Sequence, residues 1–69
     1  MIKCNLSRML GEKTLKISEV SRDTGINRGT ITRLYQNTAI RVEFEVLEKL
    51  CRYLGCEISE FLEIIDDTE

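Results

Sequence analysis

The sequence contains no histidine, no proline and no tryptophan, and only four of its 69 residues are glycine. Histidine is the side chain that most readily gains and loses a proton near neutral pH, so its absence removes the commonest general base. No nucleophile–base pair can be assembled, and the carboxylates fall at solvent-facing helical positions, so we expect no enzyme. The scarcity of proline and glycine favours helices joined by short turns.

Long apolar runs are also missing, because no more than two apolar residues follow one another. A helix that crosses a membrane needs about 20, and the first residues, MIKCNLSR, lack the apolar region of a signal peptide. We therefore expect a soluble, cytoplasmic protein with no membrane contact. The length predicts one domain, residues 1–69, which is near the size at which a single core is marginal. With 42% apolar residues the chain can still form that core.

The three cysteines, Cys4, Cys51 and Cys56, form no CxxC pair, and the chain offers no histidine to complete a metal site. A structural zinc ion needs four nitrogen or sulfur ligands. Cys51 falls on the apolar stripe of a predicted helix, where a free cysteine acts as a small hydrophobic residue. We expect three reduced thiols, no metal and no cofactor.

The formal net charge of −2 hides a separation of charge along the chain. Residues 1–42 carry eight basic side chains against three acidic ones, a net charge of +5, whereas residues 43–69 carry two against nine, a net charge of −7. Exposed charges more than ~10 Å apart are largely screened at moderate salt, so the local face decides which partner is attracted. The basic half is suited to nucleic acid, although ordinary solvated surface charge is the alternative.

Hydrophobic periodicity divides the chain into five helices, so we predict an all-α fold whose termini are extended. The predicted helices are 5–13, 17–24, 28–36, 43–54 and 58–63. Asn5 is the predicted N-cap of the first helix. Ile2 and Cys4 alternate as in a strand, and we expect them to pair with Leu62–Ile65 ahead of an acidic tail at about 66–69.

Each helix carries apolar residues at helical spacing, and these predict the core. They are Leu6, Met9, Leu10, Val20, Ile31, Leu34, Phe44, Leu47, Leu50, Cys51, Leu54, Ile58, Phe61 and Leu62, with Leu15 and Ile26 in the connections. Gly25 and Gly55 follow helices directly, where a left-handed residue commonly ends the helix.

Residues 17–36 form the centre of the prediction, as a helix, a sharp turn and a second helix. Small side chains at Ser21 and Gly25 allow the two helices to cross closely, while Ile31 and Leu34 dock the second helix on the first. The outer face of the second helix is basic and rich in hydroxyl groups. A helix of this kind, supported from behind by another helix, is suited to the major groove of DNA.

From about Ile2 to Ile65 the chain resembles the Cro/C1-type helix-turn-helix family, also called lambda-repressor-like or XRE. The segments that carry the resemblance are NLSRMLGEK, INRGTITRLYQ and LEKLCRYLGCEISEFLEII. The resemblance implies a compact five-helix DNA-binding domain that regulates transcription. The minimal single-domain members are the most similar.

Three positions depart from the family pattern. Ser21 replaces the usual alanine, which is tolerable if its hydroxyl bonds to its own helix. Ile17 replaces a glutamine that often contacts phosphate, and leaves Lys16 or Ser18 as substitutes. Gly29 stands where relatives often read a base edge, so either the backbone approaches the DNA closely there or that base pair is not read.

We predict base contacts from the exposed face of the second helix and phosphate contacts from around it. The base-reading candidates are Arg28, Gly29, Thr32 and Arg33. The phosphate-binding candidates are Lys16, Ser18, Asn27, Thr30, Asn37, Thr38 and Arg41. Arginine suits this role because its guanidinium can bind guanine O6 and N7 together.

Each of these assignments has a plainer alternative. Arg28 could simply be solvated at the start of its helix, and Arg33 could pair with Glu43 or Glu45. Tyr35, a half-buried aromatic residue beside the first helix, is more readily explained as structural than as a DNA contact.

The expected partner is double-stranded DNA, bound by a homodimer because operators usually offer two half-sites about one helical turn apart. The chain has no coiled-coil heptads, so the dimer contact would use the last helix and the termini. The alternative function is a protein-interaction module of the same fold, an antitoxin or adaptor, that works through the acidic C-terminal helices.

Overall fold

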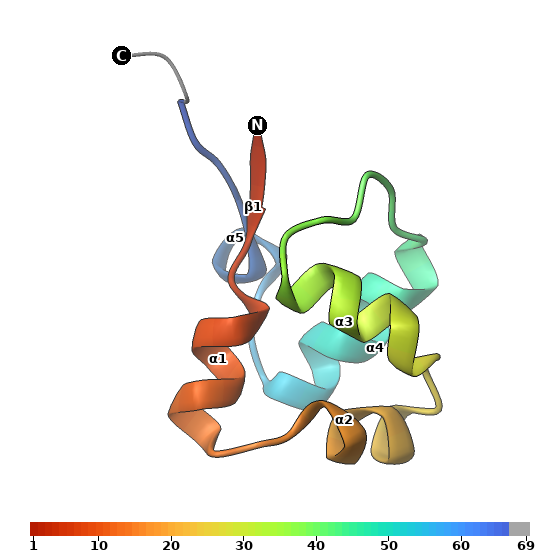
Figure 1. Ribbon diagram of the computed structural model, residues 1–69. Helices are drawn as coiled ribbons and strands as arrows, with labels where there is room; N and C mark the ends of the chain where they lie inside the picture. The colour runs from red at the N-terminus through yellow and green to blue at the C-terminus, as the bar shows by residue number, and fades with distance from the viewer. Residues whose placement is uncertain (67–69) are drawn as a thin grey trace.

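The chain folds into five helices and one small sheet, in a computed structural model that describes residues 1–66 (Figure 1). The all-α class and the five helices are therefore as expected, with the sheet confined to the two ends of the chain. In order, the elements are β1 (Ile2–Cys4), α1 (Leu6–Lys13), α2 (Ile17–Thr24), α3 (Arg28–Tyr35), α4 (Phe44–Leu54), α5 (Ile58–Phe61) and β2 (Leu62–Ile64).

Local sequence sets most of the helix boundaries. Gly25 and Gly55 take positive φ angles, +75° and +69°, and end α2 and α4 as left-handed residues. Asn27 begins α3 by accepting hydrogen bonds from the backbone N–H groups of Gly29 and Thr30. These interactions involve neighbours in the sequence, which is why the sequence could predict them.

The two ends of the chain meet in an antiparallel pair of strands, in which Ile2 lies opposite Ile64 and Cys4 lies opposite Leu62. The expected pairing of the termini is confirmed. The predicted length of the last helix was wrong, because α5 ends at Phe61 and the chain turns extended at Leu62. The partner strand, far away in sequence, binds the backbone of residues 62–64 and holds it out of the helix.

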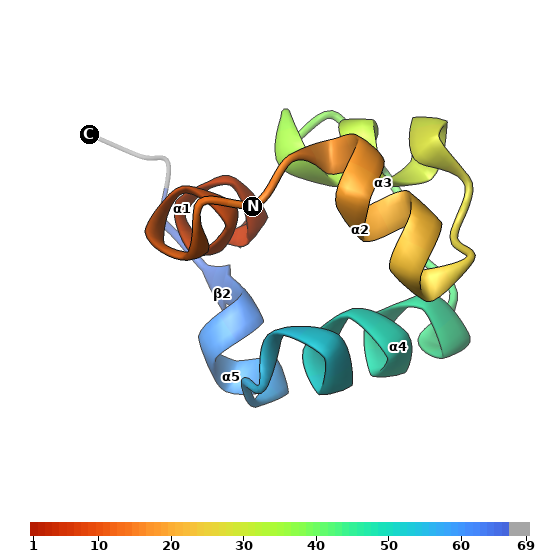
Figure 2. The same cartoon turned by 90° about the horizontal axis from the view of Figure 1, so that it is seen from below.

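The core lies between α2 and α3 on one side and α4 on the other, with α1 and α5 closing the end (Figure 2). Its largest fully buried side chains are Phe61, Leu6, Leu10, Ile31, Leu50 and Val20. Ile26 is also buried, while Leu15 is partly buried and packs against the core. The predicted core is confirmed at these positions and at Cys51.

Two predicted core residues are on the surface instead. Phe44 is 88% exposed and Ile58 is 49% exposed. Both stand at the first position of a helix, α4 and α5, so the apolar stripe extends past the end of the packed interior. Tyr35 is 38% exposed, in line with the half-buried position expected for it.

Asn5 lies at the N-cap of α1 as predicted, but its side chain does not cap the helix. It is buried, and its Nδ2 donates to the backbone oxygen of Glu60 at 3.0 Å and to Oε1 of Glu63 at 2.9 Å. The predicted capping role was wrong, because the backbone of Asn5, at φ −94° and ψ 20°, is not in the extended conformation usual for a capping residue, and its amide is turned toward Glu60 and Glu63. Asn5 thus ties α1 to α5 and β2.

Candidate nucleic-acid interface

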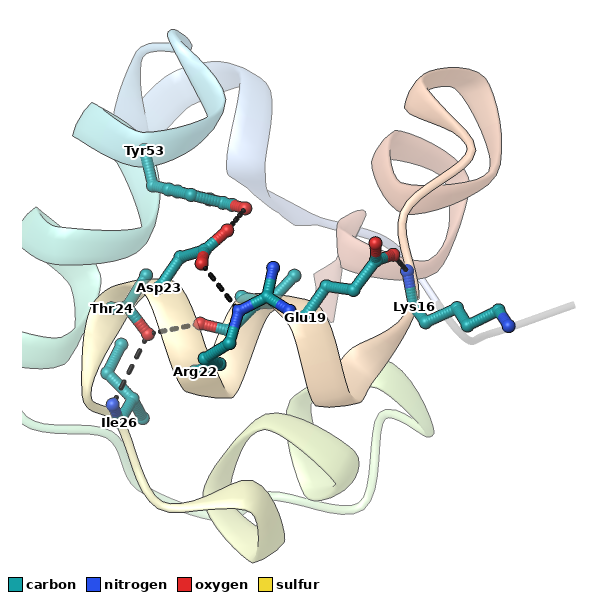
Figure 3. A network of polar contacts seen from close by, with 8 residues as sticks. Lys16, Glu19, Arg22, Asp23, Thr24, Ile26 and Tyr53 are labelled. Carbon is teal, nitrogen blue, oxygen red and sulfur yellow. Dashed lines mark hydrogen bonds and ion pairs between the residues drawn. The ribbon is translucent and has the colours of Figure 1, made fainter.

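The turn between α2 and α3 is fixed by hydrogen bonds on both sides of Ile26. The hydroxyl of Ser21 donates to the backbone oxygen of Ile26 at 2.7 Å. Thr24 Oγ1 donates to the oxygen of Val20 at 2.7 Å and accepts from the N–H of Ile26 at 3.3 Å (Figure 3). Serine in place of alanine at position 21 is therefore tolerated by a bond to the carbonyl of the turn rather than by a bond to its own helix. The turn that leads from α2 into α3 is therefore held by polar contacts with α2 as well as by packing.

The start of α2 presents Lys16 and Ser18 to solvent. The backbone N–H of Lys16 donates to Oε1 of Glu19 at 2.8 Å. The ammonium group of Lys16 belongs to none of the four ion pairs within residues 1–66. Ile17 packs against the core and offers no polar group. The cations and hydroxyls available at this corner are therefore those of Lys16 and Ser18.

A polar chain joins α2 to α4 behind the turn. The hydroxyl of Tyr53 donates to Oδ2 of Asp23 at 2.6 Å, and Nε of Arg22 donates to Oδ1 at 3.0 Å (Figure 3). The hydrogen bond from Tyr53, followed by that from Arg22, holds the pKa of Asp23 below its ordinary value. The same hydrogen bond raises the pKa of Tyr53. This contact spans 30 residues and could not be predicted from local sequence patterns.

The four residues predicted to read bases lie on the outer face of α3. Thr32 follows Arg28 by about one helical turn, and Arg33 follows Gly29 by the same distance. The hydroxyl of Thr32 donates to the backbone oxygen of Arg28 at 2.9 Å. A Cβ atom built at Gly29 would lie 3.5 Å from Nη1 of Arg33, so the guanidinium lies over that glycine. The structure thus brings the predicted base-reading residues together on one surface.

The guanidinium groups of this face have no competing partner in the described part of the chain. The four ion pairs there join Arg8 to Glu12, Arg22 to Asp23, Lys49 to Glu45, and Arg52 to Glu48. Arg28 and Arg33 are exposed and belong to none of them. The alternative pairing of Arg33 with Glu43 or Glu45 is therefore not formed.

The two predicted phosphate-binding residues at the start of α3 also serve the helix itself. Asn27 Oδ1 accepts from the N–H of Gly29 at 2.8 Å and from that of Thr30 at 3.4 Å. This cap uses the oxygen of the amide and leaves its Nδ2 group able to donate to an anion. Thr30 is partly buried.

Asn37 and Thr38, in the loop after α3, have structural roles that sequence reasoning missed. Asn37 takes a positive φ of +59°, its Oδ1 accepts from the N–H of Cys4 at 2.7 Å, and its Nδ2 donates to the oxygen of Cys4 at 3.2 Å. Thr38 donates to the oxygen of Arg33 through its N–H at 2.9 Å and its hydroxyl at 3.4 Å. Arg41 is exposed, without a hydrogen bond or ion pair in the described chain.

The helices α2 and α3 cross, and α3, the outer one, carries the exposed cationic side chains. A comparison with known families agrees with this geometry. A profile of the Cro/C1-type HTH DNA-binding domain matches residues 5–67. The chain belongs to the Cro/C1-type helix-turn-helix family. This is a family of DNA-binding domains and not of enzymes.

Individual relatives cover nearly the whole of this Cro/C1-type chain. An uncharacterized HTH-type transcriptional regulator, YozG of Bacillus subtilis (strain 168), is 26% identical over 65 residues, which are 94% of this chain and 77% of that protein. The crystal structure of transcriptional regulator VanUg, form II, superposes with a TM-score of 0.75 at 24% identity, over 96% of this chain and 87% of that one. The second comparison supports the fold.

Within 1–66, no group of three or more histidine, cysteine, aspartate or glutamate side chains is arranged to hold a metal ion. No helix there is long and apolar enough to cross a membrane. Cys4 and Cys51 are buried free thiols, and burial with the nearby Cys56 raises the pKa of Cys51 to about 11.

Proposed function

We propose that this Cro/C1-type domain is a transcriptional regulator that binds a specific double-stranded DNA sequence with α3 in the major groove. The observation that carries the proposal is the pair of exposed guanidinium groups on α3, Arg28 and Arg33, which have no ion-pair partner in residues 1–66. An unpaired guanidinium has no salt bridge to break before it contacts a base. The hydrogen-bonded turn behind it keeps α3 at a fixed angle on α2.

The remaining contacts follow from which polar atoms the fold leaves available. Arg28, Gly29, Thr32 and Arg33 face the bases in this proposal, Thr32 with its methyl group, because its hydroxyl already donates to the backbone oxygen of Arg28. The phosphates are contacted by Lys16, Ser18, Thr30, Arg41 and the Nδ2 group of Asn27. Asn37 and Thr38 were also candidates, but their polar groups are engaged by Cys4 and Arg33, so we leave them out of the proposed contact set.

Binding to DNA at increasing salt tests the proposal, with a double variant, Arg28→Ala/Arg33→Ala. A matched control, Arg8→Ala/Arg52→Ala, removes the same charge from two arginines that pair with Glu12 and Glu48. The wild type should select one sequence from a pool of random duplexes, and its affinity should fall steeply with salt as phosphate contacts release counterions.

The α3 variant should lose about 5- to 150-fold in affinity for the selected site for each arginine, since a bidentate contact discriminates by ~1–3 kcal/mol. The control should stay close to the wild type. Equal losses in the two variants would mean that only total charge matters, and affinity independent of salt would exclude phosphate contact.

We further propose that the domain acts as a homodimer, so that two copies of α3 reach two half-sites about one helical turn apart. Phe44 and Ile58, at the starts of α4 and α5, line one surface hollow, where Phe44 is almost fully exposed and Ile58 is half exposed. The residues that line this hollow, called here the α4–α5 face, are Phe44, Leu47, Glu48, Cys51, Arg52, Cys56, Glu57 and Ile58.

The α4–α5 face carries both signs of charge around an apolar centre, which suits contact with a second copy of itself. The second candidate function, a protein-interaction module, is favoured by the same observation, because an exposed phenylalanine marks a contact surface whichever protein covers it.

A further inference from the structure

The turn between α4 and α5 brings two of the three cysteines together. The chain changes direction there (Figure 2), because Gly55 ends α4 in the left-handed conformation, at a φ of +69°. The backbone N–H groups of Gly55 and Cys56 both donate to the oxygen of Cys51, that of Cys56 at 3.0 Å. At a helix end of this kind, the side chain that follows the left-handed residue commonly packs on the last turn. Cys56 therefore lies beside Cys51.

The two thiols interact with each other but differ in their access to solvent. Burial raises the pKa of Cys51 to about 11, and after burial the charge of Cys56 and a hydrogen bond between the two side chains raise it further. Cys51 is only 7% exposed and belongs to the core, whereas Cys56 is partly exposed. Both line the α4–α5 face. A reagent from solvent therefore meets Cys56 first, with Cys51 directly behind it.

Cys4, the third thiol, is a weaker candidate for the same contact. It is buried on β1, and its pKa is raised first by burial and to a smaller extent by the charge of Cys56. Its sulfur also takes part in a hydrogen bond with the backbone of Leu6. The pair of thiols that is best placed to react together is therefore Cys51 and Cys56.

We propose that Cys51 and Cys56 are a redox-modification site, at which a small organic disulfide converts the two thiols into one intramolecular disulfide. The Cys56 thiolate attacks the small disulfide, forms a mixed disulfide and releases one small thiol. Cys51 then gives up its proton, and its sulfur attacks the sulfur of Cys56 and releases the second small thiol. The protein loses two electrons and two protons, and the small disulfide gains them as it is reduced to two thiols.

This site goes beyond the proposed contact with DNA, which lies on α3. The reaction replaces two thiols of the α4–α5 face by one disulfide that closes the chain between Cys51 and Cys56. The α4–α5 face is also the surface proposed above to contact a second copy. The experiment therefore uses dilute protein, so that the face is open to the reagent.

The test treats the reduced, folded chain with oxidised glutathione, blocks the remaining thiols and digests the product with trypsin. Lys3, Arg8, Lys49 and Arg52 place the three cysteines in separate tryptic peptides, residues 4–8, 50–52 and 53–69. Mass spectrometry should find a protein that is lighter by two hydrogen atoms, with a disulfide that joins 50–52 to 53–69. A disulfide that involves 4–8, or glutathione that stays on Cys56 as the final product, would overturn the proposal.

Three variants separate the two steps. Cys51→Ala should stop the reaction at the mixed disulfide on Cys56, and Cys56→Ser should prevent it, because the remaining thiols are buried. Cys4→Ala is the matched control, since it also removes a buried thiol, and it should form the same disulfide as the wild type. Circular dichroism identifies which variants are folded. Loss of the disulfide in a folded Cys4→Ala, or its formation without Cys56, would contradict the assignment.

A comparison of folded and urea-unfolded wild type needs no variant. The equilibrium constant for exchange with glutathione should be at least about tenfold larger in the folded chain, because the helix end holds the two sulfur atoms together. An equal or smaller constant in the folded chain would mean that the turn opposes the bond, and the proposal would fail.

Discussion

Asn37 should contribute more to stability than its exposed place in a loop suggests. Its side-chain amide makes two hydrogen bonds to the backbone of Cys4, at 2.7 Å and 3.2 Å, and so covers the edge of β1 that β2 leaves open. Each such bond contributes ~0.5–1.5 kcal/mol. Its φ of +59° adds about 1 kcal/mol against a residue such as alanine, which tolerates the left-handed region poorly.

Replacing Asn37 by alanine should therefore lower the free energy of unfolding by ~2–4 kcal/mol. Proteins of this size have roughly 3–10 kcal/mol in all, from 0.05–0.15 kcal/mol per residue. The loss should appear in urea unfolding followed by circular dichroism, as a lower midpoint with an unchanged slope. Replacement by glycine should cost only the hydrogen bonds, about 1–3 kcal/mol, because glycine accepts the positive φ.

Gln36→Ala is the matched control. Gln36 is the residue before Asn37, its side chain is exposed, and its φ of −88° suits alanine. A loss below about 0.5 kcal/mol in Asn37→Ala, or equal losses for alanine and glycine, would refute the reasoning from the two hydrogen bonds and the backbone angle. Under conditions where Asn37→Gly is folded, its DNA affinity should fall with salt as steeply as that of the wild type, because its amide is not among the proposed phosphate contacts.

Two further predictions concern α4. The depressed pKa of Asp23 means that its contribution to stability is complete above the ordinary carboxyl pKa, near 4, and is lost as the pH falls through the folded value. Tyr53→Phe removes the hydrogen bond that is the largest cause of that shift. The urea midpoint of the variant should therefore depend less on pH between about 5 and 2 than that of the wild type. The same dependence of the midpoint on pH in both proteins would contradict this. Phe44→Asp should convert a dimer to a folded monomer in sedimentation equilibrium, whereas a wild type that is already monomeric at high concentration would favour the interaction module.

The sequence was a good guide wherever the deciding contacts are local. The boundaries of α2 follow from its apolar spacing and from Gly25, whose left-handed conformation ends the helix. The cationic face of α3 follows from helical periodicity alone. Family resemblance then added the DNA-binding role, which the match to residues 5–67 confirmed.

Periodicity could not tell where the packed interior stops. Phe44 and Ile58 fit the apolar stripes of α4 and α5, yet both stand at helix ends where no neighbouring element covers them. The same limit applies to residues 62–64, whose pattern continues a helix although their backbone pairs with β1. Which element covers a stripe is a property of the whole fold.

What the sequence determined by itself was the set of helices, most of the core and the outward face of α3, because helical hydrogen bonds and side-chain spacing join residues at most a few positions apart. The tertiary structure alone decided the roles of Asn5 and Asn37, whose partners lie 55 and 33 residues away. It also decided that the Arg33 guanidinium lies over Gly29, because the rotamer of an exposed arginine depends on the space around it. Sequence spacing fixes which residues share a face, and packing fixes what each of them touches.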